Sequence, residues 1–143
     1  MKQIPIKRFR VSIYGILRDS EGRVLVTEST GHSGTFMNFP GGGIDLGESP
    51  MEALHREMGE EVGLVVKPVR LLYTSLGFHR GVIKPKRQMI GIYWLVDKVS
   101  GELREGNGLD VVGVHWVAPA DLEAAAFTTF DREALPAIIA ALT

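Results

Sequence analysis

The stretch GGIDLGESPMEALHREMGEEVGL, residues 42–64, joins a run of glycines to a segment that is rich in glutamate. It also contains the start and stop signals of one helix. Ser49 can cap the first turn, the proline after it suits the first helical position, and Glu52 can complete a capping box. Gly63 is well placed as the left-handed residue that ends a helix. These signals predict a helix over about Pro50–Val62.

The two faces of this helix differ in character when its residues are placed about 100° apart around the axis. The apolar stripe consists of Met51, Leu54, Met58 and Val62. The adjoining arc carries Glu57, Glu60 and Glu61. Like charges at this spacing repel by roughly 0.3 kcal/mol per pair on an exposed helix, so something has to offset the repulsion. Two interpretations stay open: a solvated acidic face with local help from Arg56, or a site for a cation such as Mg²⁺, which takes hard oxygen ligands.

Composition and charge limit the class of protein. The chain has 143 residues, of which 45% are apolar, and this predicts one globular domain with an ordinary core. Its formal net charge of -1 gives no sign of a nucleic-acid or membrane-surface protein. Cysteine is absent, which excludes disulfides, thiolate nucleophiles and zinc-thiolate sites. The N-terminal apolar run contains Ser12 and Tyr14, so we expect a strand rather than a signal peptide or membrane helix, and a cytoplasmic protein.

The rest of the chain mixes strands with short helices. β-rich runs at 9–17 and 23–28 flank RDSEG, whose Asp, Ser and Gly supply turn chemistry, and this predicts a hairpin. Further strands are expected at 36–39, 65–78, 88–99 and 111–117. A short helical turn should follow Pro119, and a C-terminal helix should begin near Asp131, although Pro136 leaves its start uncertain.

The spacing of glycine, glutamate and arginine in the opening stretch matches a known signature. Gly42 is followed after five residues by Glu48, and after seven more by REMGEEVGL, residues 56–64. This arrangement resembles the Nudix box at every defined position, so the chain looks like a Nudix hydrolase. Two small departures are Met58, where a branched aliphatic residue is more usual, and Gly59, which weakens a helix by up to about 1 kcal/mol relative to alanine.

The resemblance implies a fold and a chemistry. The implied fold is a Nudix-type α/β/α sandwich around a mixed β-sheet, formed as one Nudix hydrolase domain over residues 1–143. The implied activity is that of a nucleotide pyrophosphatase, a hydrolase in which water attacks a phosphorus of a nucleoside diphosphate linked to another moiety. Electrostatics agrees with this activity. A pyrophosphate is negatively charged and repels an incoming hydroxide, and acidic residues can hold the pyrophosphate only through a bound metal. The expected cofactor is Mg²⁺ or Mn²⁺.

The resemblance assigns roles to the acidic cluster on the helix. Glu57 and Glu61 resemble the principal metal ligands, and Glu60 resembles a third or a water-mediated ligand. Arg56 resembles the arginine that holds the first glutamate of the cluster, because its fork-shaped donor can fix a carboxylate rotamer. Glu57 or a further carboxylate would orient the attacking water as a base. The residues expected to bind metal are Gly42, Glu48, Glu57, Glu60 and Glu61, and those expected in catalysis are Arg56, Glu57, Glu60 and Asp110.

Residues outside the helix complete this expectation. Glu48 would support the ligands from behind, and the carbonyl of Gly42 would face the metal. The family often supplies a further carboxylate from the loop before a late strand that carries a tryptophan, here Trp116. Asp110 is then the best-placed candidate and Glu105 the next. A solvated loop acid is the alternative for either residue.

Two further segments allow more than one role. The basic loop over residues 79–87 is expected to be a solvated hairpin, although its side chains could contact phosphate or a second subunit. Phe127, Thr128 and Phe130 could line a base or leaving-group pocket, while core packing is the more frequent role for such aromatic residues.

The sequence leaves the substrate open. No marker after the box selects ADP-ribose or a dinucleoside polyphosphate, so nucleoside triphosphates, including oxidised ones, sugar nucleotides and non-nucleotide diphosphates are all candidates. The expected partner is a small nucleotide-type molecule, with no nucleic acid and no membrane, and a homodimer is left open. The alternative function is a Nudix-fold ligand sensor or binding module without turnover. Broken metal ligands would be expected in that case, and here Glu57, Glu60 and Glu61 are all present.

Overall fold

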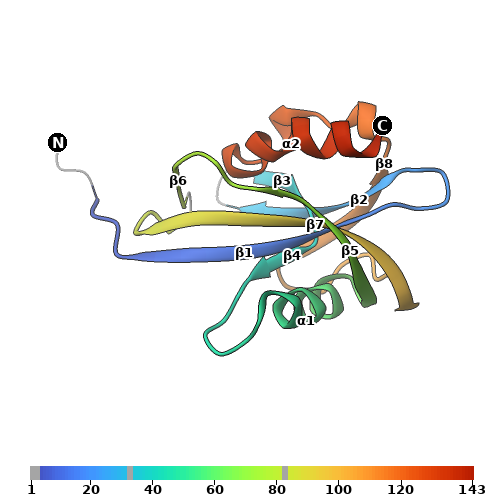
Figure 1. Cartoon of the computed structure of the whole chain (residues 1–143), viewed down its shortest axis with the longest axis horizontal. Helices are drawn as coiled ribbons and strands as arrows, with labels where there is room; N and C mark the ends of the chain where they lie inside the picture. The colour runs from blue at the N-terminus through green and yellow to red at the C-terminus, as the bar shows by residue number, and fades with distance from the viewer. Residues whose placement is uncertain (1–3, 32–33, 82–83) are drawn as a thin grey trace.

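Helices α1 (Pro50–Val62) and α2 (Thr129–Leu142) lie on opposite sides of a long central sheet (Figure 1). The structure, a computed structural model, describes residues 4–31, 34–81 and 84–143. The other elements are strands β1 (Arg8–Leu17), β2 (Val24–Gly31), β3 (Gly34–Asn38), β4 (Gly41–Gly43), β5 (Leu64–Thr74), β6 (His79–Arg80), β7 (Arg87–Gly101) and β8 (Val111–Val117), and the 3₁₀ turns η1 (Pro119–Asp121) and η2 (Ala124–Ala126).

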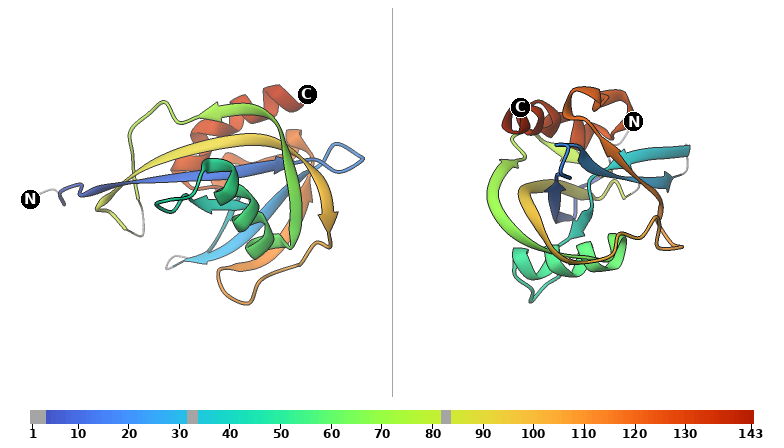
Figure 2. Two further views of the ribbon diagram at one scale, coloured as in Figure 1. Left: turned by 60° about the horizontal axis from the view of Figure 1, so that its bottom comes forward. Right: turned by 90° about the vertical axis from the view of Figure 1, so that its right-hand side faces the viewer.

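The central sheet is mixed, with the strand order β4–β1–β7–β5 and with β6 beside β7. Strands β1 and β7 run parallel, from Arg8 opposite Arg87 to Leu17 opposite Val96, and Figure 2 shows them side by side. Strand β4 pairs antiparallel with the other edge of β1, and β5 pairs antiparallel with the other edge of β7. A second, antiparallel sheet has the order β3–β2–β8. The predicted α/β class, with a mixed sheet between helices, is confirmed.

The ends of α1 follow the signals in the sequence. The hydroxyl of Ser49 accepts a hydrogen bond from the backbone N–H of Glu52 at 3.1 Å, and the Glu52 carboxylate accepts one from the backbone N–H of Ser49 at 2.9 Å. Gly63 ends the helix with a φ of 74°, in the left-handed region that is costly for residues with a Cβ. The predicted bounds and the predicted capping box are therefore confirmed.

Each helix covers a separate part of the core. Of the predicted apolar stripe of α1, Leu54, Met58 and Val62 expose no surface and Met51 is half-buried against them. Around it lie Ile13, Leu17, Leu25, Val66 and Val96. The core on the α2 side includes Ile16, Val26, Phe39, Tyr93 and Ile138. Over the described residues, no helix combines the length and the apolar character needed to cross a membrane.

The predicted hairpin between the first two strands is wrong in its pairing. The turn itself forms, because the Asp19 carboxylate accepts hydrogen bonds from two later backbone N–H groups, each at 2.9 Å. The strands then separate, and one isolated bridge, from Arg18 to Val24, joins the chain on the two sides of the turn within the described residues. Both edges of β1 are occupied by β4 and β7, so β2 pairs with β3 and β8 instead.

Other predicted bounds shift by a few residues. The strand expected to reach residue 78 ends at Thr74, because two of the backbone N–H groups that follow donate to the Glu133 carboxylate of α2 rather than to β7. The C-terminal helix begins at Thr129, two residues earlier than predicted, and Pro136 lies inside it. The last strand has its predicted bounds.

Candidate active site

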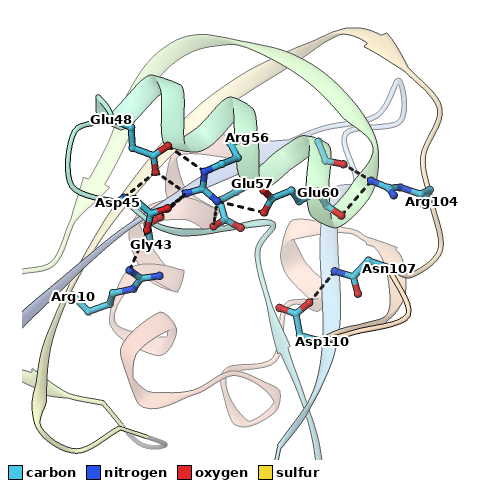
Figure 3. A network of polar contacts seen from close by, with 11 residues as sticks. Arg10, Gly43, Asp45, Glu48, Arg56, Glu57, Glu60, Arg104, Asn107 and Asp110 are labelled. Atoms are coloured by element: carbon cyan, nitrogen blue, oxygen red, sulfur yellow. Dashed lines mark hydrogen bonds and ion pairs between the residues drawn. The ribbon is translucent and has the colours of Figure 1, made fainter.

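Helix α1 and the loop before β8 line an open groove of about 610 Å³. The lining residues are Glu57, Glu60, Glu61, Arg104, Asn107, Leu109 and Asp110. In Figure 3 the loop residues Asn107 and Asp110 lie across from Glu60 of the helix. The groove therefore joins the glutamates of α1 to a carboxylate from a distant part of the sequence.

Arg56 is the centre of the polar network behind these carboxylates (Figure 3). Its Nη2 and Nε donate to the two oxygens of Glu48 at 2.6 and 3.1 Å, and its Nη1 donates to Glu57 at 2.9 Å. Nη2 also donates to the carbonyl of Gly43 at 3.0 Å, which ties the helix to β4. A longer ion pair joins Nη1 to Glu60 at 3.3 Å. A further ion pair joins Nη2 to Asp45 at 3.4 Å, so one guanidinium group contacts four carboxylates at once.

Glu48 faces Arg56 rather than the groove. Both of its oxygens accept hydrogen bonds from Arg56, and Oε1 also accepts one from the backbone N–H of Asp45 at 2.8 Å. The hydrogen bonds from Arg56, followed by the one from Asp45, lower the pKa of Glu48 to about 2. In this arrangement Glu48 holds Arg56 in place, and it does not line the groove.

Glu57 occupies the space that a side chain at Gly42 would need. A Cβ built at Gly42 would lie 2.6 Å from the carboxyl carbon of Glu57 and 2.7 and 2.8 Å from its two oxygens. The pairing of Gly42 with Ile13 fixes this glycine within the sheet. The carboxylate of Glu57 therefore lies directly against the backbone of β4, an approach that requires a residue without a Cβ.

Glu57 and Glu61 lie close together in the more buried part of the groove. The Glu57 side chain is 14% exposed and Glu61 is 8% exposed, whereas the Glu60 side chain is 59% exposed. Burial raises the pKa of Glu57, and hydrogen bonds from Arg56 offset part of the effect. Burial, then the charges of Glu57 and Asp110, raise the pKa of Glu61 to about 9. Carboxylates brought together in this way retain protons, and a nearby cation would favour their charged forms instead.

The two candidate loop acids lie in different environments. Asp110 lines the groove, while Glu105 is exposed and lies outside the lining. Oδ1 of Asp110 accepts a hydrogen bond from the Asn107 side chain at 2.8 Å. The side-chain oxygen Oδ1 of Asn107 in turn accepts a hydrogen bond from the backbone N–H of Val111 at 3.1 Å, which holds the loop in this shape. The charge of Asp110 is also close enough to raise the pKa of Glu61.

Arg104 lines the groove as well, and sequence reasoning missed it. Its guanidinium donates to the carbonyl of Gly59 and, at 3.2 Å, to that of Glu60, both in the last turn of α1. Carbonyls at a helix C-terminus need partners from outside the helix, and a cation there also interacts favourably with the helix dipole. Nothing local to Arg104 in the sequence indicates that its loop returns to the end of α1.

The chemistry of the groove suits a divalent cation. Glu57 and Glu61 provide hard carboxylate oxygens, and the backbone at Gly42 approaches them without a Cβ between. In the part of the chain that the structure describes, no three His, Cys, Asp or Glu side chains stand in the arrangement that holds a metal ion. A bound ion would take further ligands from water, and Mg²⁺ usually keeps several waters. The exposed side chain of Glu60 could also reach the ion by changing its rotamer. The donor set therefore fits the cation.

A second cavity, of about 300 Å³, lies between the central sheet and the start of α2. Its lining includes Tyr14, Phe36, Asn38, Met89, Thr128 and Phe130. Of the aromatic residues considered for a pocket, Phe130 lines this cavity. Phe127 is 3% exposed and stacks on Phe39 in the core, with the ring centroids 5.2 Å apart. Phe130 thus has the pocket role and Phe127 the core role.

The basic loop is not simply the solvated hairpin that was expected. Its first two residues form β6, which pairs with β7. Three of its basic residues, Arg80, Lys84 and Arg87, line the second cavity. Arg80 and Arg87 are half-buried there and Lys84 is exposed, so the expectation of a solvated loop is wrong for the two arginines and not for Lys84.

Strand β1 joins the cavity to the groove. Tyr14 lines the cavity and stands opposite Gly41 of β4, and the next residue, Gly42, is the one against which Glu57 of the groove lies. Burial raises the pKa of Tyr14 most strongly, and the charges of Asp131 on one side and Glu61 on the other add to the effect.

Comparison with known proteins gives a family match and curated relatives. The sequence model of the NUDIX domain matches residues 8–138. An RNA pyrophosphohydrolase from Psychrobacter cryohalolentis is 47% identical over 79 residues, which cover 55% of this chain and 44% of that protein. An 8-oxo-dGTP diphosphatase from Escherichia coli is 30% identical over 117 residues, which cover 77% of this chain and 86% of that protein. The chain spans less than half the length of the RNA pyrophosphohydrolases that it matches.

Solved structures share the fold. A MutT protein from Methanosarcina mazei has a TM-score of 0.74 at 18% identity, with 91% of this chain and 92% of that chain covered. A MutT NUDIX hydrolase from Burkholderia pseudomallei has a TM-score of 0.75 at 24% identity, with 92% and 98% covered. At these identities the likeness shows the architecture. With the family match over most of the sequence and the glutamate-bearing helix in the expected place, the chain belongs to the Nudix family.

Proposed function

We propose that this protein is a metal-dependent hydrolase that cleaves the pyrophosphate bond of a nucleoside diphosphate linked to another moiety. One observation carries the proposal: Glu57, Glu61 and Asp110 line one groove, and the paired strands β4 and β1 connect it to a separate cavity. Glu57 of the groove lies against Gly42 of β4, and Tyr14 of β1 lines the cavity. A groove lined by carboxylates can hold a pyrophosphate only with cations between them. The cavity is of a size that suits the rest of a small substrate.

Magnesium or manganese would be held by Glu57 and Glu61, with Glu60 and the carbonyl of Gly42 as further ligands. Such an ion, when bound, neutralises phosphoryl oxygens and lowers the pKa of a water molecule that it holds. Nudix hydrolases generally use divalent metals, in agreement with this assignment. Glu48 would contribute indirectly, because its two oxygens hold Arg56.

The remaining roles follow from the contacts of the groove. Arg56 is a positioning residue: its Nη1 holds one oxygen of Glu57, and the other two guanidinium nitrogens hold Glu48. Asp110 is the proposed base that takes a proton from the attacking water, since it is an exposed carboxylate with one oxygen fixed by Asn107. Glu57 is the second candidate for the base, and its contact with Arg56 favours its ionised form.

The relatives suggest which substrates to test first. The 8-oxo-dGTP diphosphatase of Escherichia coli is matched over 86% of its length, so nucleoside triphosphates, including oxidised ones, come first. The RNA pyrophosphohydrolases suggest RNA as a second class. Sugar nucleotides and other diphosphates form a third class that shares the same scissile bond.

A screen for phosphate release and product mass tests the proposal. The wild type, Glu57→Gln and the control Glu102→Gln are each incubated with a nucleotide library in Mg²⁺ or Mn²⁺. We expect turnover that needs the metal and that falls by orders of magnitude in Glu57→Gln. Glu102 is an exposed residue outside the groove, so its variant should match the wild type. Full turnover in excess chelator would refute the metal dependence.

A sensor or binding module without turnover is the alternative function. It predicts that calorimetry detects tight nucleotide binding while mass spectrometry detects no product at any metal and pH. Cleavage of any library member at a rate that depends on Glu57 contradicts this alternative. The presence of Glu57, Glu60 and Glu61 together favours the enzyme.

A further inference from the structure

The cavity beside α2 runs along strand β7. Alternate residues of a strand share one face, which puts four residues of β7 on the side that faces α2: Arg87, Met89, Gly91 and Tyr93. A Cβ at Gly91 would lie 2.5 Å from Cζ of Phe130, so the Phe130 ring lies against the strand at that point. Met89 and Phe130 therefore give the cavity an apolar middle.

One end of the cavity carries positive charge without a matching carboxylate. The Nε atom of Arg87 is buried and has no hydrogen-bond partner among the described residues. In the same part of the chain, no carboxylate lies within 4.0 Å of Arg87 or Arg80. Arg80 donates to the carbonyls of Ile4 and Pro85 at 2.7 and 2.5 Å, and these acceptors are neutral. The whole chain has a net charge of -1, so the positive charge is a local feature.

The neighbours of Arg87 add to this charge. Arg8 of β1 stands beside Arg87 in the parallel pairing. Burial, and then the charges of Arg10 and Arg8, lower the pKa of Arg87. Of these neighbours, Arg10 forms an ion pair with Asp45 at 3.8 Å. Guanidinium groups gathered in this way repel one another, and an anion bound among them would remove the repulsion.

The opposite end of the cavity has polar groups that are already paired. Asp131 is 2% exposed and accepts a hydrogen bond from the Tyr93 hydroxyl at 2.5 Å. The side-chain oxygen of Asn38 accepts a hydrogen bond from the Thr27 hydroxyl. Among the described residues that line the cavity, Asp131 is the one carboxylate, and it is engaged by Tyr93 and does not neutralise Arg87.

We propose that the cavity takes a substrate moiety with its own phosphate, in addition to the pyrophosphate, and that Arg87 binds this phosphate. This inference rests on the proposed function, because it places the pyrophosphate in the groove. A guanidinium group can bind a phosphate or carboxylate through two parallel N–H donors. From Gly91 to Arg87 the strand spans roughly 13 Å at about 3.3 Å per residue, which leaves room for a ring and a charged substituent.

Three pairs of compounds test the inference, and the two members of each pair share a polyphosphate. In the first two pairs the members differ in one further phosphate, and in the third pair they differ in a further phosphate that joins a second adenosine. The pairs are NAD⁺ and NADP⁺, dephospho-coenzyme A and coenzyme A, and ATP and the 5′-triphosphorylated dinucleotide pppApA. Calorimetry in Ca²⁺, with chromatography to show that no product forms, gives the Kd of each compound. We expect the added phosphate to tighten binding roughly tenfold in at least one pair, as for one charge-assisted contact. A preference confined to the third pair identifies a polynucleotide phosphate, and one in the first two pairs identifies a coenzyme-type nucleotide.

Variants of the cavity show whether Arg87 causes the preference. Arg87→Gln should bring the ratio of the two Kd values to about one, and Arg87→Lys should keep part of the preference. Arg18→Gln makes the same change of charge at the far end of β1 and should keep the wild-type ratio. Circular dichroism melts verify that each variant folds. A ratio near one for every pair in the wild type, or a ratio that survives Arg87→Gln, overturns the inference.

Turnover in Mg²⁺ separates this inference from the proposed function. If ATP is cleaved but every ratio is near one, the proposed function stands and the role of Arg87 is refuted. If the expected ratio is found but no compound in the library is cleaved, the hydrolase assignment fails and the cavity is a binding site for an anionic nucleotide.

Discussion

Gly42→Ala should lower turnover by about a hundredfold while leaving the fold intact. The φ angle of Gly42 is not positive, so an alanine backbone is unstrained there. The new Cβ would lie 2.6–2.8 Å from three carboxyl atoms of Glu57, whereas ordinary van der Waals contact begins near 3.4 Å. The carboxylate of Glu57 must therefore move by about 0.7 Å, the difference between these distances.

A displacement of this size matters because other contacts restrain Glu57. One of its oxygens accepts a hydrogen bond from Arg56 at 2.9 Å, and Arg56 is itself held by Glu48. Misplacing a reacting group by about 1 Å can cost on the order of 10²-fold in rate. The effect on stability should be small, because the end of one side chain moves and the packed backbone does not.

The assay compares kcat and the free energy of unfolding in Gly42→Ala and in a matched control. Gly59→Ala adds the same methyl group to α1 at a position where no atom lies within 4 Å of the new Cβ. It should keep wild-type turnover and gain up to about 1 kcal/mol of stability. Wild-type kcat in Gly42→Ala would refute the argument that this close contact places Glu57. A large loss of stability would instead indicate a defect in the β4–β1 pairing.

Three further predictions concern individual side chains. Glu57→Gln should reduce kcat by orders of magnitude with little change in thermal stability, whereas Met58→Ala should cost about 2–5 kcal/mol, because Met58 is fully buried; equal destabilisation by both would make the glutamate structural. Asp110→Asn should lower kcat in a pH-dependent way and leave nucleotide affinity in Mg²⁺ largely intact, while Glu105→Gln should behave as wild type; a normal kcat–pH profile in Asp110→Asn would remove the proposed base. Burial raises the pKa of Asp131 from 3.8 to about 6, so the folded chain binds this proton more tightly and stability is lost as the pH rises between these values. In urea unfolding, the free energy of unfolding of Asp131→Asn should therefore rise relative to that of the wild type from about pH 4 to about pH 7. A difference in this free energy that stays constant with pH would contradict the shifted pKa.

The sequence predicts α1 well because the signals for its ends are local. Ser49 and Glu52 bond to each other three residues apart, and Gly63 acts through its own backbone angle. The pairing of β2 could not be predicted in the same way. Its neighbours in the sheet are decided by β4 and β7, which occupy both edges of β1, and no residue near the Asp19 turn carries that information.

In the candidate site, too, contacts between residues close in sequence could be predicted, and contacts that depend on the fold could not. The contact of Arg56 with Glu57 joins adjacent residues, and the box spacing indicates it. The choice between Asp110 and Glu105 depends on the path of a loop, and the structure puts Asp110 in the groove lining and leaves Glu105 outside it. Arg87 could be read from the sequence only as part of a basic loop. Its place in a cavity depends on the parallel pairing of β7 with β1 and on the packing of α2.

The β4–β1 pairing links the two parts of the proposed substrate site. Tyr14 opposite Gly41 and Ile13 opposite Gly42 set the distance between cavity and groove through backbone hydrogen bonds, which side-chain substitutions in either part leave in place. The glutamates of the groove are carried by α1 and Asp110 by the loop before β8, whereas Arg87 and Met89 of the cavity are carried by β7. Changes on β7 should therefore alter KM and the preference among substrates, and changes on α1 should alter kcat for all of them. A chain built in this way can change the moiety that it accepts without moving the groups proposed to cleave the phosphoanhydride.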